Sequence, residues 1–216
     1  MGSSVADPTR REHLHRRGLR LERFTIGWNV IEAGVAITAG IIAGSTSLVA
    51  FGADSSIEVL SAVALLWRLR KAGPHATAGE HGAAERRALQ LVAATFFLLA
   101  AYAAFESISA LAAQEAPDRS TVGLVLSVLS LLVMPVLAHA KQKTGRELGS
   151  EALQADAVET WVCSYLSLAL LLGVGLFMAF GWWWADAAGA VAMLPVVLWQ
   201  GWETLGKARE EDGEAA

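Results

Sequence analysis

Residues 51–62 read FGADSSIEVLSA and lie in the middle of a long apolar run. This stretch carries two acids, Asp54 and Glu58, although no lysine or arginine occurs between Gly27 and Trp67. An ionised side chain at the centre of a membrane helix costs about 2.5–3.5 kcal/mol on insertion scales. Acids four residues apart share one face of a helix. The stretch therefore predicts a membrane-spanning helix with a functional acidic face.

The composition of the whole chain also favours a membrane protein. Of its 216 residues, 54% are hydrophobic and only 18% are charged, and the mean hydropathy is +0.43. The 20 glycines and 8 tryptophans fit membrane helices, where glycine allows close packing and tryptophan lies at the interfaces. The net charge of -4 gives no reason to expect nucleic acid as a partner. Because Cys163 is the single cysteine, an intramolecular disulfide is excluded.

Six segments are long and apolar enough to cross a bilayer, which takes about 20 residues. We expect an all-α membrane protein with six transmembrane helices, at residues 24–43, 46–67, 88–113, 121–140, 152–178 and 182–202. The chain then divides into a basic N-terminal arm (1–23), a transmembrane domain (24–205) and a short acidic tail (206–216).

Basic residues predict the orientation of these spans. All lysines and arginines except Arg119 fall in the N-terminal arm, the second and fourth connections and the C-terminal tail. The fourth connection, for example, is expected to hold Lys141, Lys143 and Arg146. Because cytoplasmic loops carry the excess of positive charge, we expect both termini in the cytoplasm and the protein in the cell (inner) membrane.

A second pair of candidate ligands occurs in the fifth span. Glu159 and Cys163 repeat the four-residue spacing of Asp54 and Glu58. At about 1.5 Å per residue both pairs lie near mid-membrane, so two facing helices would bring four ligands to one point. Such a set suits a tetrahedral divalent metal. Like charges repel in the empty site, so some carboxylates should hold protons that metal binding expels. The pattern thus predicts a metal site and metal–proton exchange.

Other polar positions admit two interpretations each. Glu32 and Glu106 either serve function or only bridge helices. Cys163 is either a ligand or a small buried apolar residue. Asp156 lies on a different helix face from Cys163, so we expect it beside the site or on an access route. Gly40, in a G-x-x-x-G pattern with Gly44, could pack helices closely, and a single pattern of this kind is only a weak signal of a dimer contact.

Two segments outside the spans contain histidine. His75, Glu80 and His81 lie in the second connection, where they either bind a second metal or are simply solvated. His13 and His15 lie in the basic arm, which we expect to be attracted to anionic lipid.

These motifs resemble those of the cation diffusion facilitator family. The similar segments are STSLVAFGADSSIEVLSA at 45–62, SEALQADAVETWVCSYLSLALLLG at 150–173 and WWWADAAGAVAML at 182–194. The resemblance covers about residues 24–205 and places the family's ligand positions on Asp54, Glu58, Glu159 and Cys163. It implies a six-helix bundle, proton-coupled export of Zn²⁺, Mn²⁺, Fe²⁺, Co²⁺ or Cd²⁺, and a homodimer.

The chain departs from the typical family pattern in three ways. No histidine occurs among the four ligand positions, and Cys163 stands where aspartate is usual, so the preferred metal is open. The cytoplasmic metal-binding domain that commonly follows the spans is replaced by the acidic tail. The chain is therefore most similar to the truncated form of the family, with a transmembrane domain only.

Together these observations predict a proton-coupled transporter that exports divalent metal, with Zn²⁺ first and Fe²⁺, Mn²⁺, Co²⁺ or Cd²⁺ as alternatives. The other interpretation is a non-transporting metal-binding membrane protein, such as a sensor or an assembly subunit. An enzyme is not expected, because neither H-E-x-x-H nor G-x-S-x-G occurs. No cofactor is expected beside the transported metal. The expected partners are the metal ion, protons, the lipid bilayer and a second copy of the chain.

Overall fold

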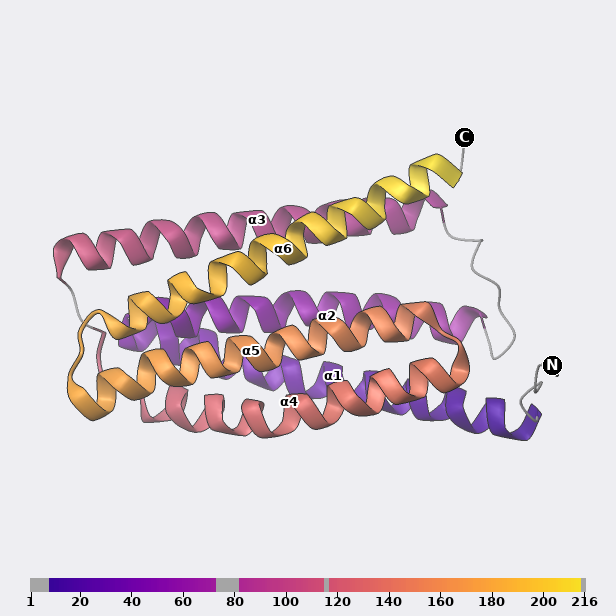
Figure 1. The fold of residues 1–216 in the computed structure, drawn as a ribbon, viewed down its shortest axis with the longest axis horizontal. Coiled ribbons are helices and arrows are strands. Elements are labelled where there is room, and N and C mark those ends of the chain that lie inside the picture. Colours follow the sequence, from indigo (N-terminus) through magenta and orange to yellow (C-terminus); the bar gives the residue numbers. More distant parts are fainter. Residues whose placement is uncertain (1–7, 73–81, 115–116, 215–216) are drawn as a thin grey trace, which may run out of the picture.

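The fold is a bundle of six long helices, seen in a computed structural model that describes residues 8–72, 82–114 and 117–214 (Figure 1). Within these residues no strand occurs. The helices are α1 (Pro8–Ala43), α2 (Thr46–Ala72), α3 (Gly82–Ala113), α4 (Thr121–Leu148), α5 (Glu151–Phe180) and α6 (Ala185–Glu214). The predicted all-α class with six helices is confirmed.

Five of the six helices, α1 to α5, contain segments long and apolar enough to cross a membrane. The sixth, α6, runs the length of the bundle beside α3, but Asp186, Pro195 and Gln200 interrupt its apolar sequence (Figure 1). The chain is therefore an integral membrane protein in which α6 has a shorter apolar segment than the other five helices.

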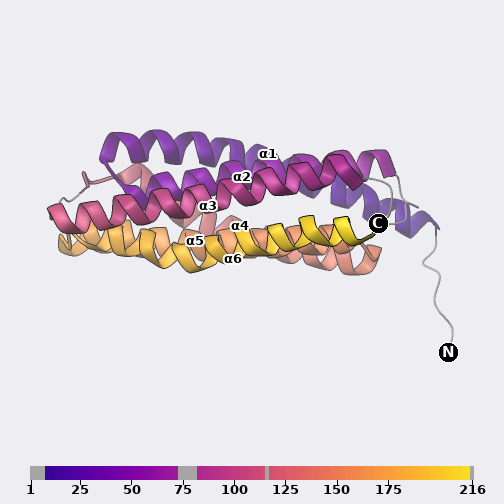
Figure 2. The same cartoon turned by 90° about the horizontal axis from the view of Figure 1, so that it is seen from above.

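The helices form two groups. The helices α1, α2, α4 and α5 pack together, through the neighbouring pairs α1–α2, α4–α5, α1–α4 and α2–α5. The helices α3 and α6 form a separate pair that contacts this four-helix group through α2 and α5 (Figure 1). In the view turned by 90°, α1 and α2 lie on one side and α5 and α6 on the other (Figure 2). The α2–α5 interface therefore lies inside the molecule.

The helices alternate in direction, so α1 begins and α6 ends at the same end of the bundle, which we call the terminal end (Figure 1). The turn between α4 and α5 also lies at the terminal end. Gly149 ends α4 with a left-handed φ of 68°, and Ser150 caps α5 by accepting a hydrogen bond from the Leu153 N–H at 3.3 Å. This tight turn fixes the start of α5. It therefore also fixes where the polar residues of α5, from Asp156 to Cys163, lie relative to α4.

Small residues let α1 and α2 approach closely. A Cβ on Gly40 would lie 2.7 Å from Val49 Cγ2 and 2.8 Å from Val49 N, and one on Gly52 would lie 2.8 Å from Ile37 Cγ1. Gly40 therefore packs against the next helix of its own chain. The prediction that Gly40 allows close helix packing is confirmed, and the helix that it contacts is α2 of the same chain.

Helix boundaries differ from those expected, most of all in α1, α4 and α6. The basic arm from Pro8 is continuous with the first span in α1, and α6 begins only after the three tryptophans and continues to Glu214. Neither end of the predicted transmembrane domain, at 23/24 or 205/206, coincides with a helix end. The helix α4 runs to Leu148, so Lys141 lies inside a helix and is fully buried. Its assignment to a connecting loop was wrong.

Candidate metal centre

The acidic face of α2 is buried against α5. Asp54 and Glu58 are 4% and 6% exposed, one helical turn apart, and both lie on the side of α2 that faces the interior. Thr160 of α5 donates a hydrogen bond to Glu58 Oε1 at 3.0 Å, and the Cys163 thiol lies against the same carboxylate. The structure thus brings together Glu58 and Cys163 from the two predicted pairs.

The surroundings of Asp54 are strongly acidic. The charged side chains that interact with it electrostatically are Glu58, Glu32 and Glu159. Glu58 Oε2 has no hydrogen-bond partner among the described residues. Buried anionic groups of like sign require protons or a cation as compensation. The α2–α5 interface therefore buries acids whose charge must be compensated by protons or by a cation.

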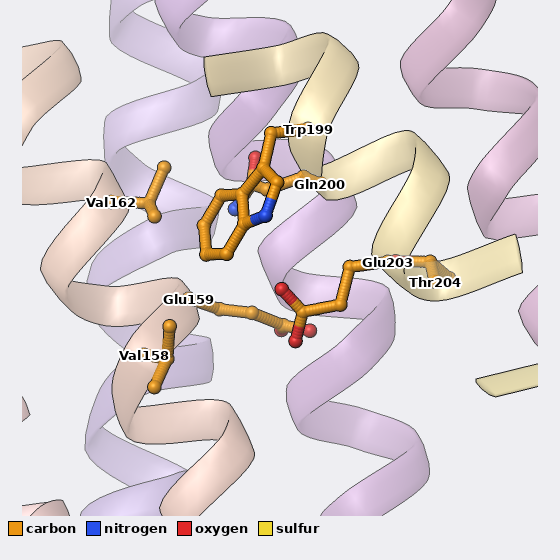
Figure 3. Close-up of a pocket in the computed structure, with 7 residues that line it drawn as sticks. All are labelled: Val158, Glu159, Val162, Trp199, Gln200, Glu203 and Thr204. Carbon is orange, nitrogen blue, oxygen red and sulfur yellow. The ribbon is translucent and has the colours of Figure 1, made fainter. Parts of the chain in front are cut away.

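Glu159 contacts residues of both α2 and α6. Its Oε2 accepts a hydrogen bond from Ser61 at 2.7 Å, and its side chain lies beside Glu203 and Trp199 at the α5–α6 interface (Figure 3). Within the described residues, no three His, Cys, Asp or Glu side chains are arranged so that they could hold a metal ion. The four-residue metal site remains a prediction, and assembling it requires its side chains to come closer together than they lie in this structure.

Glu32 joins three helices. It accepts hydrogen bonds from Ser55 of α2 at 2.9 Å, from Ser130 of α4 and from Trp28 of its own helix at 3.2 Å. Its side chain is 1% exposed. These contacts fit the interpretation of Glu32 as a helix bridge. One helical turn earlier, Asn29 is fully buried and has no partner for its amide among the described residues.

A second charged cluster lies nearer the terminal end. Lys141 of α4 forms ion pairs with Asp156 of α5 and, at 3.7 Å, with Glu22 of α1. It also donates a hydrogen bond to Thr160 Oγ1 at 3.2 Å. We call Lys141, Glu22, Asp156 and Thr160 the lysine cluster. Asp156, expected beside the metal site, is connected to Glu58 through Thr160.

The sequence contained one weak signal of this cluster. Glu22 and Asp156 are acids next to apolar runs, but their partner Lys141 looked like an ordinary cation of a basic connection. The remaining candidates add little. Glu106 is partly buried on α3 beside Tyr102. His13 is exposed and His15 is buried on α1. The positions of His75, Glu80 and His81 lie outside the described residues.

The chain is similar in sequence to several membrane proteins. It is 26% identical over 180 residues to the uncharacterized transporter sll1263 of Synechocystis, covering 82% of this chain and 58% of the relative. It is 26% identical over 160 residues to the cation-efflux pump FieF of Shewanella oneidensis, covering 73% and 54%. It is 25% identical over 176 residues to transmembrane protein 163 of Xenopus laevis, covering 81% and 61%.

The chain therefore spans only 54% to 61% of the length of these curated relatives. The matched region nevertheless includes the buried acids of α2 and the facing residues of α5. A model of the cation efflux transmembrane domain matches residues 24–211, from the middle of α1 almost to the end of α6, and the chain therefore belongs to the cation efflux family.

Proposed function

We propose that this protein exports divalent metal cations in exchange for protons, through a site formed by Asp54, Glu58, Glu159 and Cys163. The observation that carries the proposal is the buried acid pair of α2, which faces Cys163 of α5 and whose Asp54 interacts electrostatically with three other acids. Membership of the cation efflux family and the similarity to a cation-efflux pump support transport over other uses of such a pair.

Proton exchange follows from the charge of the site. Without metal, the clustered carboxylates avoid mutual repulsion by holding protons. A divalent ion offsets two negative charges and is bound by deprotonated ligands, so its arrival expels protons. When protons bind to the ligands again, they lower the affinity of the site for the metal, which is then released. Alternate exposure of this one site to the two sides of the membrane would couple metal export to proton import.

Zn²⁺ is the proposed cargo. A site with a thiolate and three carboxylates offers one soft and three hard donors, and tetrahedral coordination by such a set suits Zn²⁺. If the carboxylates dominate the coordination, the harder ions Fe²⁺, Mn²⁺ and Co²⁺ are the alternatives. If the Cys163 thiolate dominates it, Cd²⁺ is the alternative. We further propose a homodimer in the cell (inner) membrane with both termini in the cytoplasm, as the distribution of basic residues favours.

The direct test uses purified protein in proteoliposomes that contain a metal-sensitive dye and a pH-sensitive dye. With the wild type, addition of external Zn²⁺ should raise the internal metal signal and move protons outward. Asp54→Ala, reconstituted at equal density, should show neither signal. Zn²⁺ flux by Asp54→Ala at the wild-type rate would contradict the proposal that Asp54 is part of the transport site.

The other candidate function, metal binding without transport, is favoured by one observation: Glu159 accepts a hydrogen bond from Ser61, and the described residues hold no assembled group of three ligands. It predicts that wild-type protein binds Zn²⁺ in detergent and moves none into vesicles. The same preparation therefore separates a transporter from a sensor or assembly subunit.

The orientation is tested by cysteine labelling. Arg119 and Arg146 are exposed at opposite ends of the bundle, and the native Cys163 is buried and should not react. In intact cells a membrane-impermeant maleimide should label Arg119→Cys and should label Arg146→Cys only after permeabilisation. Labelling of Arg146→Cys from outside would reverse the proposed orientation.

A further inference from the structure

The lysine cluster joins three helices without contact with water. Lys141 is 0% exposed, Glu22 is 0% exposed and Asp156 is 4% exposed, and they come from α4, α1 and α5. Removing charges from water is costly, and an ion pair often fails to offset that cost compared with apolar packing. A buried triad is therefore weak evidence of a purely stabilising role.

The cluster has few donors for its acceptors. Among the described residues no N–H or hydroxyl donates to Glu22 or to Asp156 Oδ1, and the Glu22 carboxyl lies against Asp156 as well as Lys141. A cluster whose only role is to hold helices together is expected to satisfy its polar atoms. The ammonium of Lys141 instead directs one of its contacts to the Thr160 hydroxyl.

Thr160 connects the cluster to the proposed metal site. Its single hydroxyl hydrogen faces two acceptors, the Asp156 carbonyl at 3.1 Å and Glu58 Oε1 at 3.0 Å. A threonine inside a helix ordinarily donates to the carbonyl four residues earlier. Here the ammonium occupies a lone pair of the same oxygen, which polarises the hydroxyl, and the ionised carboxylate is the stronger acceptor. The Thr160 hydroxyl therefore donates preferentially to Glu58, and the contacts run from Lys141 through Thr160 to Glu58.

We propose that Lys141 is a positioning residue for metal binding: through the Thr160 hydroxyl it holds the Glu58 carboxylate in one orientation. Glu58 Oε1 is engaged by Thr160, so Oε2, which has no hydrogen-bond partner among the described residues, is the atom presented to the metal. This inference rests on the proposed function, because it gives Lys141 a role in the same site. Lys141 does not itself contact the metal.

The need for such a group follows from the neighbours of Glu58. Asp54 and Cys163 lie close to it, and once these ligands lose their protons to bind a metal, the repulsion between them would turn Glu58 away. A fixed cation behind the carboxylate offsets part of this repulsion. Partners of this kind around metal ligands typically contribute about 10–100-fold in affinity.

The decisive variant is Thr160→Val, which removes the hydroxyl, keeps the side-chain shape and leaves the Lys141–Asp156 pair intact. Zn²⁺ affinity is measured for purified protein in detergent, and the KM and maximal rate for Zn²⁺ are measured in proteoliposomes. We expect about tenfold weaker affinity and a similar rise in KM. Thr160→Ser, which restores a hydroxyl, should return both quantities close to wild-type values.

Thr144→Val is the matched control. Thr144 is also a fully buried threonine near the terminal end, but its hydroxyl donates only to the Ala140 carbonyl, at 2.8 Å. Its loss should leave the affinity for Zn²⁺ unchanged. An equal loss in both variants would mean a general packing effect and would overturn the inference. So would wild-type affinity in Thr160→Val.

A double-mutant cycle tests the route from Lys141 to Glu58. Lys141→Met should weaken Zn²⁺ binding at least as much as Thr160→Val, and adding Thr160→Val to Lys141→Met should add little, because both break one chain of contacts. If Lys141→Met does not fold, Thr160→Val combined with Glu58→Gln replaces it and should again be non-additive. Additive losses overturn the inference. A wild type that binds no Zn²⁺ overturns the proposed function itself.

Discussion

The four-helix group of α1, α2, α4 and α5 and the α3–α6 pair bury different kinds of side chain. The four-helix group encloses a set of charged residues that includes Glu22, Glu32, Asp54, Glu58, Lys141 and Asp156. The described part of the α3–α6 pair buries few polar side chains, Ser107, Asp186, Gln200 and Thr204. Its contacts include the edge-to-face pair of Phe97 and Trp202, with ring centroids 5.3 Å apart.

This difference shows that the buried charged side chains, which are costly to remove from water, are concentrated in one part of the bundle. Several charged side chains inside the four-helix group have a hydrogen-bond or ion-pair partner on another helix, as Glu32 has with Ser55 and Ser130 and Lys141 has with Asp156. The α3–α6 pair joins that group at the end opposite the termini, where Asp186 of α6 accepts hydrogen bonds from Ser45 at 2.6 Å and from Ser47. We therefore interpret the α3–α6 pair as a structural support for the four-helix group, which contains most of the buried charged residues.

The largest expected effect is on the rate of Zn²⁺ uptake, and it is tested by replacing one glutamate in each region. Glu58→Ala should lower the initial rate of Zn²⁺ uptake into proteoliposomes at least about 100-fold, because it removes a proposed ligand whereas partners of ligands alone contribute 10–100-fold. Glu106→Ala on α3 should leave the rate within about twofold, since that acid lies outside the four-helix group. Equal losses in the two variants would remove the functional distinction between the regions.

The next effect concerns pH and should arise only from the four-helix group. Each proton that a metal ion displaces makes the apparent affinity fall about tenfold per unit of pH decrease. If two protons leave on binding, affinity for Zn²⁺ should fall about 100-fold from pH 7 to pH 6, as measured by titration in detergent. The loss runs toward acid pH because protonated carboxylates and thiol do not bind the metal. A pH-independent affinity would argue against exchange.

A smaller effect, on metal preference, tests Cys163. If the thiolate is a ligand, Cys163→Ser should lose the preference for Cd²⁺ and Zn²⁺ over Mn²⁺, and Cys163→Asp should keep transport and shift it toward metals that prefer oxygen. If Cys163 only packs, Cys163→Ser should leave the ranking of metals unchanged and Cys163→Asp should mainly lower stability. Competition between metals in the uptake assay distinguishes the two.

The smallest effect is expected in the α3–α6 pair. Phe97→Ala removes the edge-to-face contact with Trp202, and such pairs contribute about 0.5–1.5 kcal/mol beyond area burial. Thermal unfolding in detergent should occur at a slightly lower temperature, while the KM for Zn²⁺ stays at the wild-type value. A change of KM without a change of stability would mean that the pair takes part in transport.

Much of the architecture could be predicted from local patterns. Apolar runs of span length predicted six helices, and an even number of alternating helices brings both ends of the chain to one end of the bundle. The four-residue spacing placed Asp54 and Glu58 on one face of α2, and the structure buries both. The boundaries were less certain, because hydropathy falls at a membrane surface whereas a helix such as α1 or α6 can continue beyond it.

The sequence alone determined that this is a bundle of membrane helices with an acidic pair in its interior, because length, hydropathy and helical periodicity are local properties. Only the tertiary structure decided which charges meet. Lys141 belongs to a basic stretch that looks like a loop, and its burial between Glu22 and Asp156 depends on how far α4 extends and on how α1 and α5 pack against it. The direction of the Glu159 side chain likewise depends on Ser61 of another helix. The partner of a buried charge is a long-range property, so no spacing within one helix can specify it.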